Sequence, residues 1–112
     1  MLKIFAFLTK REDFETEAFI NYYENNHVPL VISLAPTPTV YKRNYLVRGD
    51  QFNREDDTID FDVVTELVFP DRQAFAAWTE QLSVEAIGTD EQTFLDRSRT
   101  RAYVIEEYAT AA

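Results

Sequence analysis

The only histidine of the chain, His27, is its most informative candidate for chemistry. A neutral imidazole accepts a proton near neutral pH, so this side chain is a candidate general base. Its four-residue spacing from Tyr23, and that of Tyr23 from Phe19, places all three side chains on one face of a helix. A histidine that caps this helix or hydrogen-bonds a loop carbonyl fits the same spacing, so the sequence leaves a structural role open.

Aromatic side chains make up 14% of the chain, and several can form a binding site for a small molecule. Phenol rings stack on planar or apolar ligands, and their hydroxyl groups donate hydrogen bonds. The same rings can instead belong to the hydrophobic core, which is the commoner role of aromatic side chains at helical spacing. The candidate substrate-binding residues are Tyr22, Tyr23, Tyr41, Tyr45, Trp78 and Phe94.

Residue counts exclude several kinds of site. Without cysteine, the chain has no thiolate zinc site, no iron–sulfur cluster and no disulfide. One histidine excludes metal sites with several imidazole ligands, and the isolated Gly49 and Gly88 exclude glycine-rich phosphate-binding loops. We therefore expect a protein without a metal or another bound cofactor.

Length and charge limit the architecture and the partners. With 112 residues, the chain is expected to form a single domain over residues 1–112. Its net charge of −9 repels polyphosphate, which argues against nucleic acid and anionic membranes as partners. The apolar start is short and is followed at once by charged residues, so it resembles neither a membrane span nor a leader, and we expect a cytoplasmic protein.

Hydrophobic periodicity predicts the secondary structure. An exposed loop is expected over 50–60, and the second helical region is expected to end at Gly88, with a loop or single turn over 89–99. The resulting order, β-α-β-β-α-β, predicts an α+β fold of the ferredoxin-like type, with a four-stranded antiparallel sheet and helices on one face. Strands are expected over 2–10, 39–48, 61–69 and 101–108, and helices over 14–26, over 28–35 after an interruption near Pro29, and from 70 onwards.

The strands carry apolar side chains on both faces. Helices can cover only one face of such a sheet, so a monomer leaves the second set exposed to water. Packing against a second copy would bury that set, and a twofold pair is the commonest closed assembly. We therefore expect a homodimer whose contact face contains Phe5, Phe7, Val64, Val68, Tyr103 and Ile105.

Two segments of the sequence resemble the EthD family. The first, FINYYENNHVPLV, covers residues 19–31, and the second, DEQTFLDRSRTRAYVIEE, covers residues 90–107. The opening KIFAFLTKRED and the block DVVTELVFPDRQAFAAW extend the resemblance over nearly the whole chain. The positions that match the family pattern are Tyr22, Tyr23, His27, Pro29, Leu30, Phe94, Asp96 and Arg99.

The resemblance implies a dimeric α+β barrel, in which two ferredoxin-like protomers pack sheet against sheet and each keeps a cleft between its helices and its sheet. Members of the family include a protein required beside a cytochrome P450 system in ether degradation. Others belong to polyketide pathways, with assigned dehydratase, decarboxylase or oxidoreductase roles. The resemblance also strengthens the case for His27 as a functional residue, but it implies no single reaction.

Two functions follow as hypotheses. The first is a small cofactor-free enzyme, a lyase, cyclase or oxidoreductase of the EthD type. It binds an apolar, aromatic or polyketide-like substrate, His27 transfers a proton, and a tyrosine hydroxyl stabilises the oxyanion. The second is a non-catalytic protein that binds a small molecule or supports an oxidative pathway of the cytochrome P450 type, with a structural His27.

Overall fold

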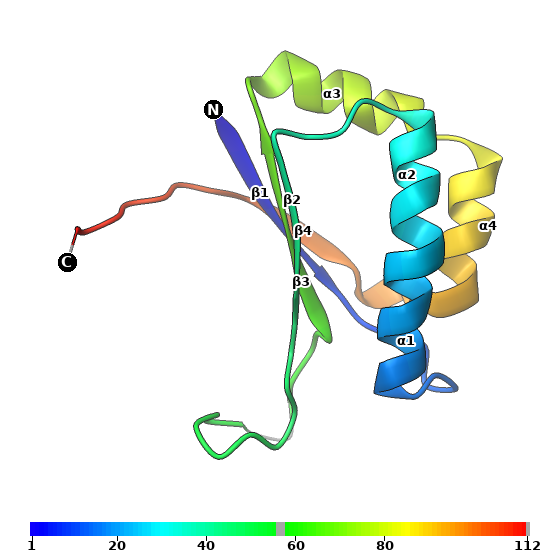
Figure 1. Cartoon of the computed structure of the whole chain (residues 1–112), viewed down its shortest axis with the longest axis vertical. Helices are drawn as coiled ribbons and strands as arrows, with labels where there is room; N and C mark the ends of the chain where they lie inside the picture. The colour runs from blue at the N-terminus through cyan, green and yellow to red at the C-terminus, as the bar shows by residue number, and fades with distance from the viewer. Residues whose placement is uncertain (56–57, 112) are drawn as a thin grey trace.

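The computed structural model describes residues 1–55 and 58–111 of the chain. A four-stranded antiparallel sheet carries the helices on one face, and its opposite face is uncovered (Figure 1). This is the predicted ferredoxin-like α+β fold, and the prediction is confirmed. The strands are β1 (Leu2–Leu8), β2 (Val40–Tyr45), β3 (Val63–Phe69) and β4 (Arg101–Ile105), in the spatial order β2-β3-β1-β4.

Alternation along the central strand β1 determines which side chains meet the helices. Leu2, Ile4 and Leu8 are buried on the helix-bearing face. Phe7, one position out of phase, lies on the other face, where its ring centroid is 6.1 Å from that of Tyr103. Phe61, which precedes β3, also packs against Phe7, with 5.7 Å between ring centroids.

The helices α1 (Thr16–Tyr22) and α2 (Val28–Leu34) form one continuous helix, joined by a π-helical turn over Tyr23–His27. The expected interruption near Pro29 is absent from this segment. A proline lacks an N–H group and displaces the carbonyl four residues earlier, and the wider turn directly before it accommodates this. Within the turn, the Val28 N–H donates to the Tyr23 carbonyl, five residues earlier.

Helix α3 (Arg72–Gln81) begins two residues after the predicted start at residue 70. The Asp71 carboxylate accepts a hydrogen bond of 2.8 Å from the Ala74 N–H, as an N-cap residue does. The helix packs Trp78 on Phe69 of β3, with 5.3 Å between ring centroids. It therefore covers the half of the sheet that α1 and α2 leave free.

Helix α4 (Glu85–Phe94) corrects the prediction that the helical region ends at Gly88. Gly88 lies inside this helix, and the expected loop is helical up to Phe94, followed by a short 3-10 turn at Arg97–Arg99. An interior glycine costs a helix only about 1 kcal/mol. Burial of Ile87 and Phe94 on the same helix outweighs this cost.

The predicted loop follows β2, and its residues 56 and 57 lie outside the described part of the chain. Within the described residues, no helix is both long and apolar enough to cross a membrane.

Candidate active site

His27 faces a carboxylate from the helix opposite. Its Nδ1 atom lies 2.7 Å from Oδ2 of Asp90, and both side chains are about nine-tenths buried. The second carboxylate oxygen of Asp90 accepts a hydrogen bond of 2.7 Å from the Tyr22 hydroxyl. The π-helical turn supplies His27 and α4 supplies Asp90, so the pair forms only when the two helices pack together.

This arrangement determines how the imidazole ring is protonated. An ionised carboxylate only accepts hydrogen bonds, so Nδ1 of His27 carries the proton that it shares with Asp90. In the neutral ring, Nε2 keeps its lone pair, and it has no hydrogen-bond partner among residues 1–55 and 58–111. Burial, followed by the hydrogen bond to Asp90, raises the pKa of Tyr22, which therefore remains a donor at neutral pH. The contact with Asp90 therefore leaves Nε2 as the nitrogen that can act as a base.

The imidazole lies in the wall of a pocket between α2, α3 and α4. The pocket has a volume of about 460 Å³, which is within the range of small-molecule sites. Its wall combines apolar side chains with polar ones, among them one carboxylate and one guanidinium. The lining residues are His27, Val31, Trp78, Thr79, Leu82, Ser83, Val84, Ile87, Gly88, Glu91 and Arg97.

Trp78 separates this pocket from a second, more apolar one of about 310 Å³, which Pro36, Pro38, Phe69 and Ala77 help to line. The indole Nε1 is buried and has no hydrogen-bond partner in the described structure. A buried donor without a partner costs about 1–3 kcal/mol. An acceptor on a bound molecule is one way to satisfy it.

Two of the candidate substrate-binding residues lie in the hydrophobic core. Tyr23 and Phe94 are 2% and 0% exposed, and neither lines either of these pockets. The Tyr23 hydroxyl is 2.7 Å from the Thr65 hydroxyl, and burial raises the pKa of Tyr23 to about 12. Both residues pack against the imidazole of His27, with ring centroids 5.2 Å away. Their contacts position His27.

Tyr41 and Tyr45 line a separate, open depression beside β2. There, Arg43 donates two hydrogen bonds to the Glu24 carboxylate, of 3.0 and 2.5 Å, and the Tyr45 hydroxyl donates a third of 2.5 Å. The Arg43 guanidinium also lies over the Tyr41 ring, 4.8 Å from its centroid. Of the candidate catalytic and substrate-binding residues, only His27 and Trp78 line the pocket between α2, α3 and α4. Tyr22 lies behind the histidine, where its hydroxyl is hydrogen-bonded to Asp90.

The Glu24 carboxylate makes the stability of the fold depend on pH. Hydrogen bonds from Arg43 lower the pKa of Glu24 in the folded state. Because the pKa of Glu24 is lower in the folded state, its ionisation stabilises the fold at pH values above the unfolded-state pKa of about 4.3. This stabilisation is lost as the pH falls through the folded-state pKa. In urea unfolding at about pH 6 and pH 3, Glu24→Gln is expected to remove up to about 1 kcal/mol of the pH-dependent free energy of unfolding. Glu17→Gln, at an exposed position of α1, is the control and should leave the dependence unchanged.

Asp90 and Arg97 were not among the predicted site residues. Both lie in the segment expected to be a loop, where a carboxylate has no defined direction. The available signal was the spacing of Ile87, Asp90 and Phe94, three and then four residues apart, which places them on one face of a helix. Gly88 hid this signal, because glycine is a poor helix former and indicated the end of the helical region.

Comparison with solved structures supports the fold. A crystal structure of an ethyl tert-butyl ether D (EthD) family protein from Bacillus halodurans superposes with a TM-score of 0.63 at 20% identity, covering 96% of this chain and 100% of that one. A solution structure of a hypothetical Arabidopsis thaliana protein gives a TM-score of 0.59 at 13% identity, with 99% and 89% covered. The crystal structure of HapK from Hahella chejuensis gives 0.59 at 14% identity, with 100% and 99% covered.

A search of curated proteins finds no match. The family model of the EthD domain matches residues 11–98, which contain the segment 19–31 and the first half of the segment 90–107, together with His27, Asp90 and Arg97. The chain belongs to the EthD family.

Proposed function

We propose that the chain is a small cofactor-free enzyme that transfers a proton on an apolar, aromatic or polyketide-like molecule bound in the pocket beside His27. The observation that carries this proposal is the His27–Asp90 pair, whose free nitrogen belongs to a residue of the pocket wall. A base oriented by a carboxylate through its other nitrogen is a recurring arrangement in proton-transfer catalysis.

In the proposed reaction, Nε2 of His27 takes a proton from a carbon next to a carbonyl group, or from a phenol. Asp90 stabilises the imidazolium that forms, because its carboxylate is 2.7 Å from Nδ1. The sequence predicted that a tyrosine would hold the resulting oxyanion, but the lining of this pocket contains no tyrosine. Trp78 lines this pocket, and its Nε1–H, which has no partner in the described structure, is a candidate donor to the oxyanion. Dehydration and cyclisation can begin from such an anion, decarboxylation produces one that His27 can then protonate, and oxidation of the anion also requires an external oxidant such as dioxygen.

Hydrogen–deuterium exchange tests proton transfer without knowledge of the natural substrate. Acetophenone and para-acetylbenzoate are incubated with the protein in D2O, and proton NMR follows the loss of the methyl hydrogens next to the ketone. Saturable exchange above the buffer rate is expected for at least one of them, because His27 supplies a base in an apolar site. Binding of both ketones without any accelerated exchange would contradict the enzyme proposal.

A non-catalytic binding protein is the second candidate function. The apolar pocket on the other side of Trp78 favours it, because no ionisable side chain lines that pocket. Such a site can hold an apolar molecule for a partner in an oxidative pathway, but it has no base to react with it. Binding without exchange, unaffected by changes at His27, is the result expected from this function.

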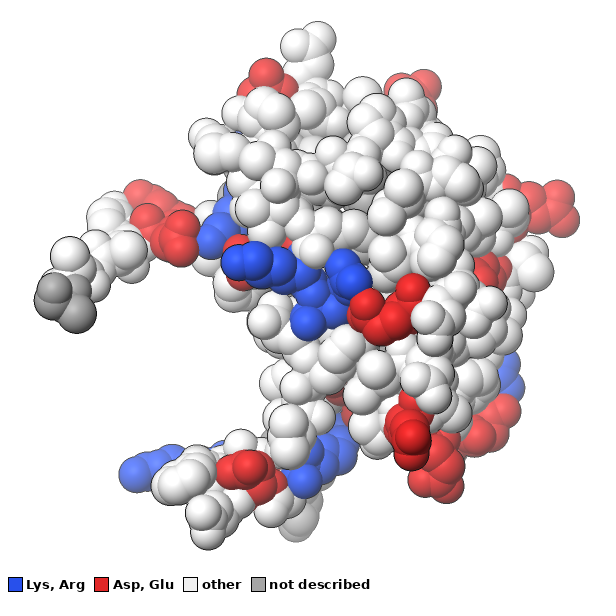
Figure 2. Space-filling model, in the orientation of Figure 1, with Lys and Arg blue, Asp and Glu red and all other residues white. Residues whose placement is uncertain are grey.

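The uncovered face of the sheet supports the proposed homodimer. Tyr103, in edge strand β4, is 51% exposed and packs on Phe7, so an aromatic cluster faces water. The C-terminal segment and the segment after β2 extend beyond the sheet on the same side, and the outline is hollowed between them (Figures 1 and 2). Each carries a ring that is almost fully exposed, Tyr108 and Phe52. A second copy packed sheet to sheet would bury these groups.

A charge on this face is expected to separate the two copies. Wild-type protein should have twice the 13.1 kDa mass of one chain in light scattering coupled to size exclusion, and Tyr103→Glu should shift the mass to that of one chain. Ile32→Glu is the matched control, since Ile32 is 48% exposed but lies on α2, away from the uncovered face. A wild-type mass of 13.1 kDa at about 100 μM would contradict the dimer.

A further inference from the structure

Arg97 is the only cationic side chain among the residues that line the His27 pocket. Its Nε atom lies 3.6 Å from Oε1 of Glu91, an ion pair too long for a strong hydrogen bond. It makes no side-chain hydrogen bond within the described part of the chain, and half of its side chain is exposed. The N–H groups of its two Nη atoms are therefore free to donate hydrogen bonds.

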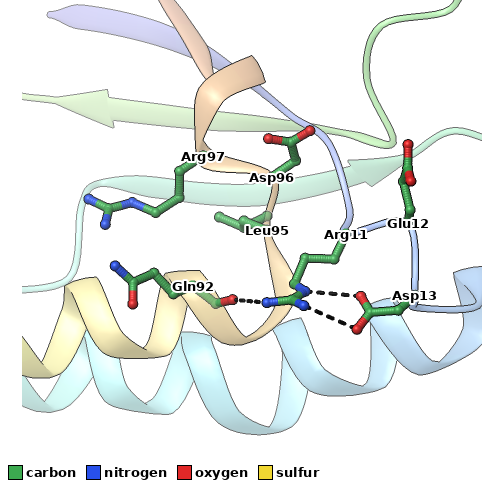
Figure 3. Close-up of a pocket in the computed structure, with 7 residues that line it drawn as sticks. All are labelled: Arg11, Glu12, Asp13, Gln92, Leu95, Asp96 and Arg97. Atoms are coloured by element: carbon green, nitrogen blue, oxygen red, sulfur yellow. Dashed lines mark hydrogen bonds and ion pairs between the residues drawn. The ribbon is translucent and has the colours of Figure 1, made fainter.

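Arg97 stands at the boundary between two depressions. It also lines the neighbouring one, where Arg11 is held by Asp13 and by the Gln92 carbonyl (Figure 3). In that view, the Arg97 guanidinium extends away from Arg11 and Asp13, and no interaction joins it to the residues drawn. Unlike Arg11, Arg97 makes no salt bridge to a carboxylate of its own loop among the described residues.

The Arg97 guanidinium lies beside Gly88 at the pocket. A Cβ atom at position 88 would lie 3.9 Å from Nη1 of Arg97, so this end of the side chain passes directly over the helix at its glycine. Both residues line the pocket. Because Nε faces Glu91, the edge formed by the two Nη groups is the one left for a ligand.

The hydroxyl groups of the pocket do not compete for this role. Ser83 donates to the Thr79 carbonyl at 2.9 Å, and Thr79 donates to the Phe75 carbonyl at 3.0 Å, so both hydroxyl protons serve the backbone. The pocket thus combines apolar side chains, the imidazole of His27 and one guanidinium with free donors. A planar guanidinium with two free N–H groups binds a carboxylate through two parallel hydrogen bonds.

We infer that the ligand of this pocket is an apolar-bodied carboxylate: Arg97 binds the carboxylate group, and the apolar body lies against Val31, Leu82 and Ile87 beside His27. The inference rests on the proposal that this pocket is the reaction site. The net charge of −9 opposes anions at long range, so recognition depends on the local contact with Arg97.

The fluorescence of Trp78 tests the inference, because this residue is the only tryptophan and lies in the pocket wall. Two probes of the same shape are titrated, para-butylbenzoate and the neutral para-butylbenzamide, each to about 10 mM. The wild type is expected to bind the benzoate at least about tenfold more tightly than the benzamide. Arg97→Gln should remove this preference and leave benzamide binding unchanged.

Arg54→Gln is the matched control, because it makes the same change of net charge at an exposed position outside the pocket lining. It should keep the preference for the benzoate. Equal binding of both probes by the wild type, a preference that survives Arg97→Gln, or no saturable change with the benzoate would each overturn the inference. A protein that prefers the benzoate through Arg97 but catalyses no exchange would contradict the proposed enzyme instead.

Discussion

Replacement of His27 by glutamine is expected to lower the rate of hydrogen–deuterium exchange by a factor of about 10² to 10⁴, the usual contribution of a general base. The glutamine amide can still donate a hydrogen bond to Asp90, so the packing of the π-helical turn on α4 should persist. The variant has no basic nitrogen to present to the pocket. Exchange rates at saturating ketone, with circular dichroism as the check on folding, measure the effect.

Two further variants separate catalysis by His27 from a structural role. Asp90→Asn should lower the rate and shift its pH profile, because an amide at this position no longer requires the proton to be on Nδ1. Tyr22→Phe leaves the His27–Asp90 pair in place and should change the rate by no more than about tenfold. An unchanged exchange rate in His27→Gln would remove the histidine from the mechanism.

Truncation of Phe94 to alanine is expected to lower the free energy of unfolding by about 3–5 kcal/mol. The ring is 0% exposed and packs between Phe19 and Tyr22, with ring centroids 5.8 and 5.0 Å away. For a domain whose total stability is about 5–15 kcal/mol, this loss is a large share. Urea unfolding followed by circular dichroism measures it.

Phe94→Leu keeps the measurement informative if the alanine variant fails to fold, with an expected loss of about 1–1.5 kcal/mol. Phe52→Ala is the control at a ring that is 86% exposed, where the change should stay within about 0.5 kcal/mol. A loss below about 1 kcal/mol in Phe94→Ala would contradict its position in the core and restore it as a candidate for ligand contact.

The sequence by itself determined the sheet and the helix that carries His27. Alternation along residues 2–8 separated Leu2, Ile4 and Leu8 from Phe5 and Phe7, because a strand places successive side chains on opposite faces, and the first set is the one that the helices bury. The spacing of Phe19, Tyr23 and His27 identified the buried face of the first helix, and all three are under 9% exposed. These are local patterns, and local geometry is enough to interpret them.

Only the tertiary structure decided what surrounds the histidine. Asp90 lies 63 positions from His27, and the packing of α4 against the π-helical turn brings their atoms to 2.7 Å. Local propensity at Gly88 argued against that helix, but burial of its apolar side chains and the Asp90 contacts compensate for the glycine. Pairs so far apart in sequence leave no periodic signal, so neither the carboxylate behind the base nor the guanidinium across the pocket could be assigned before the chain was folded.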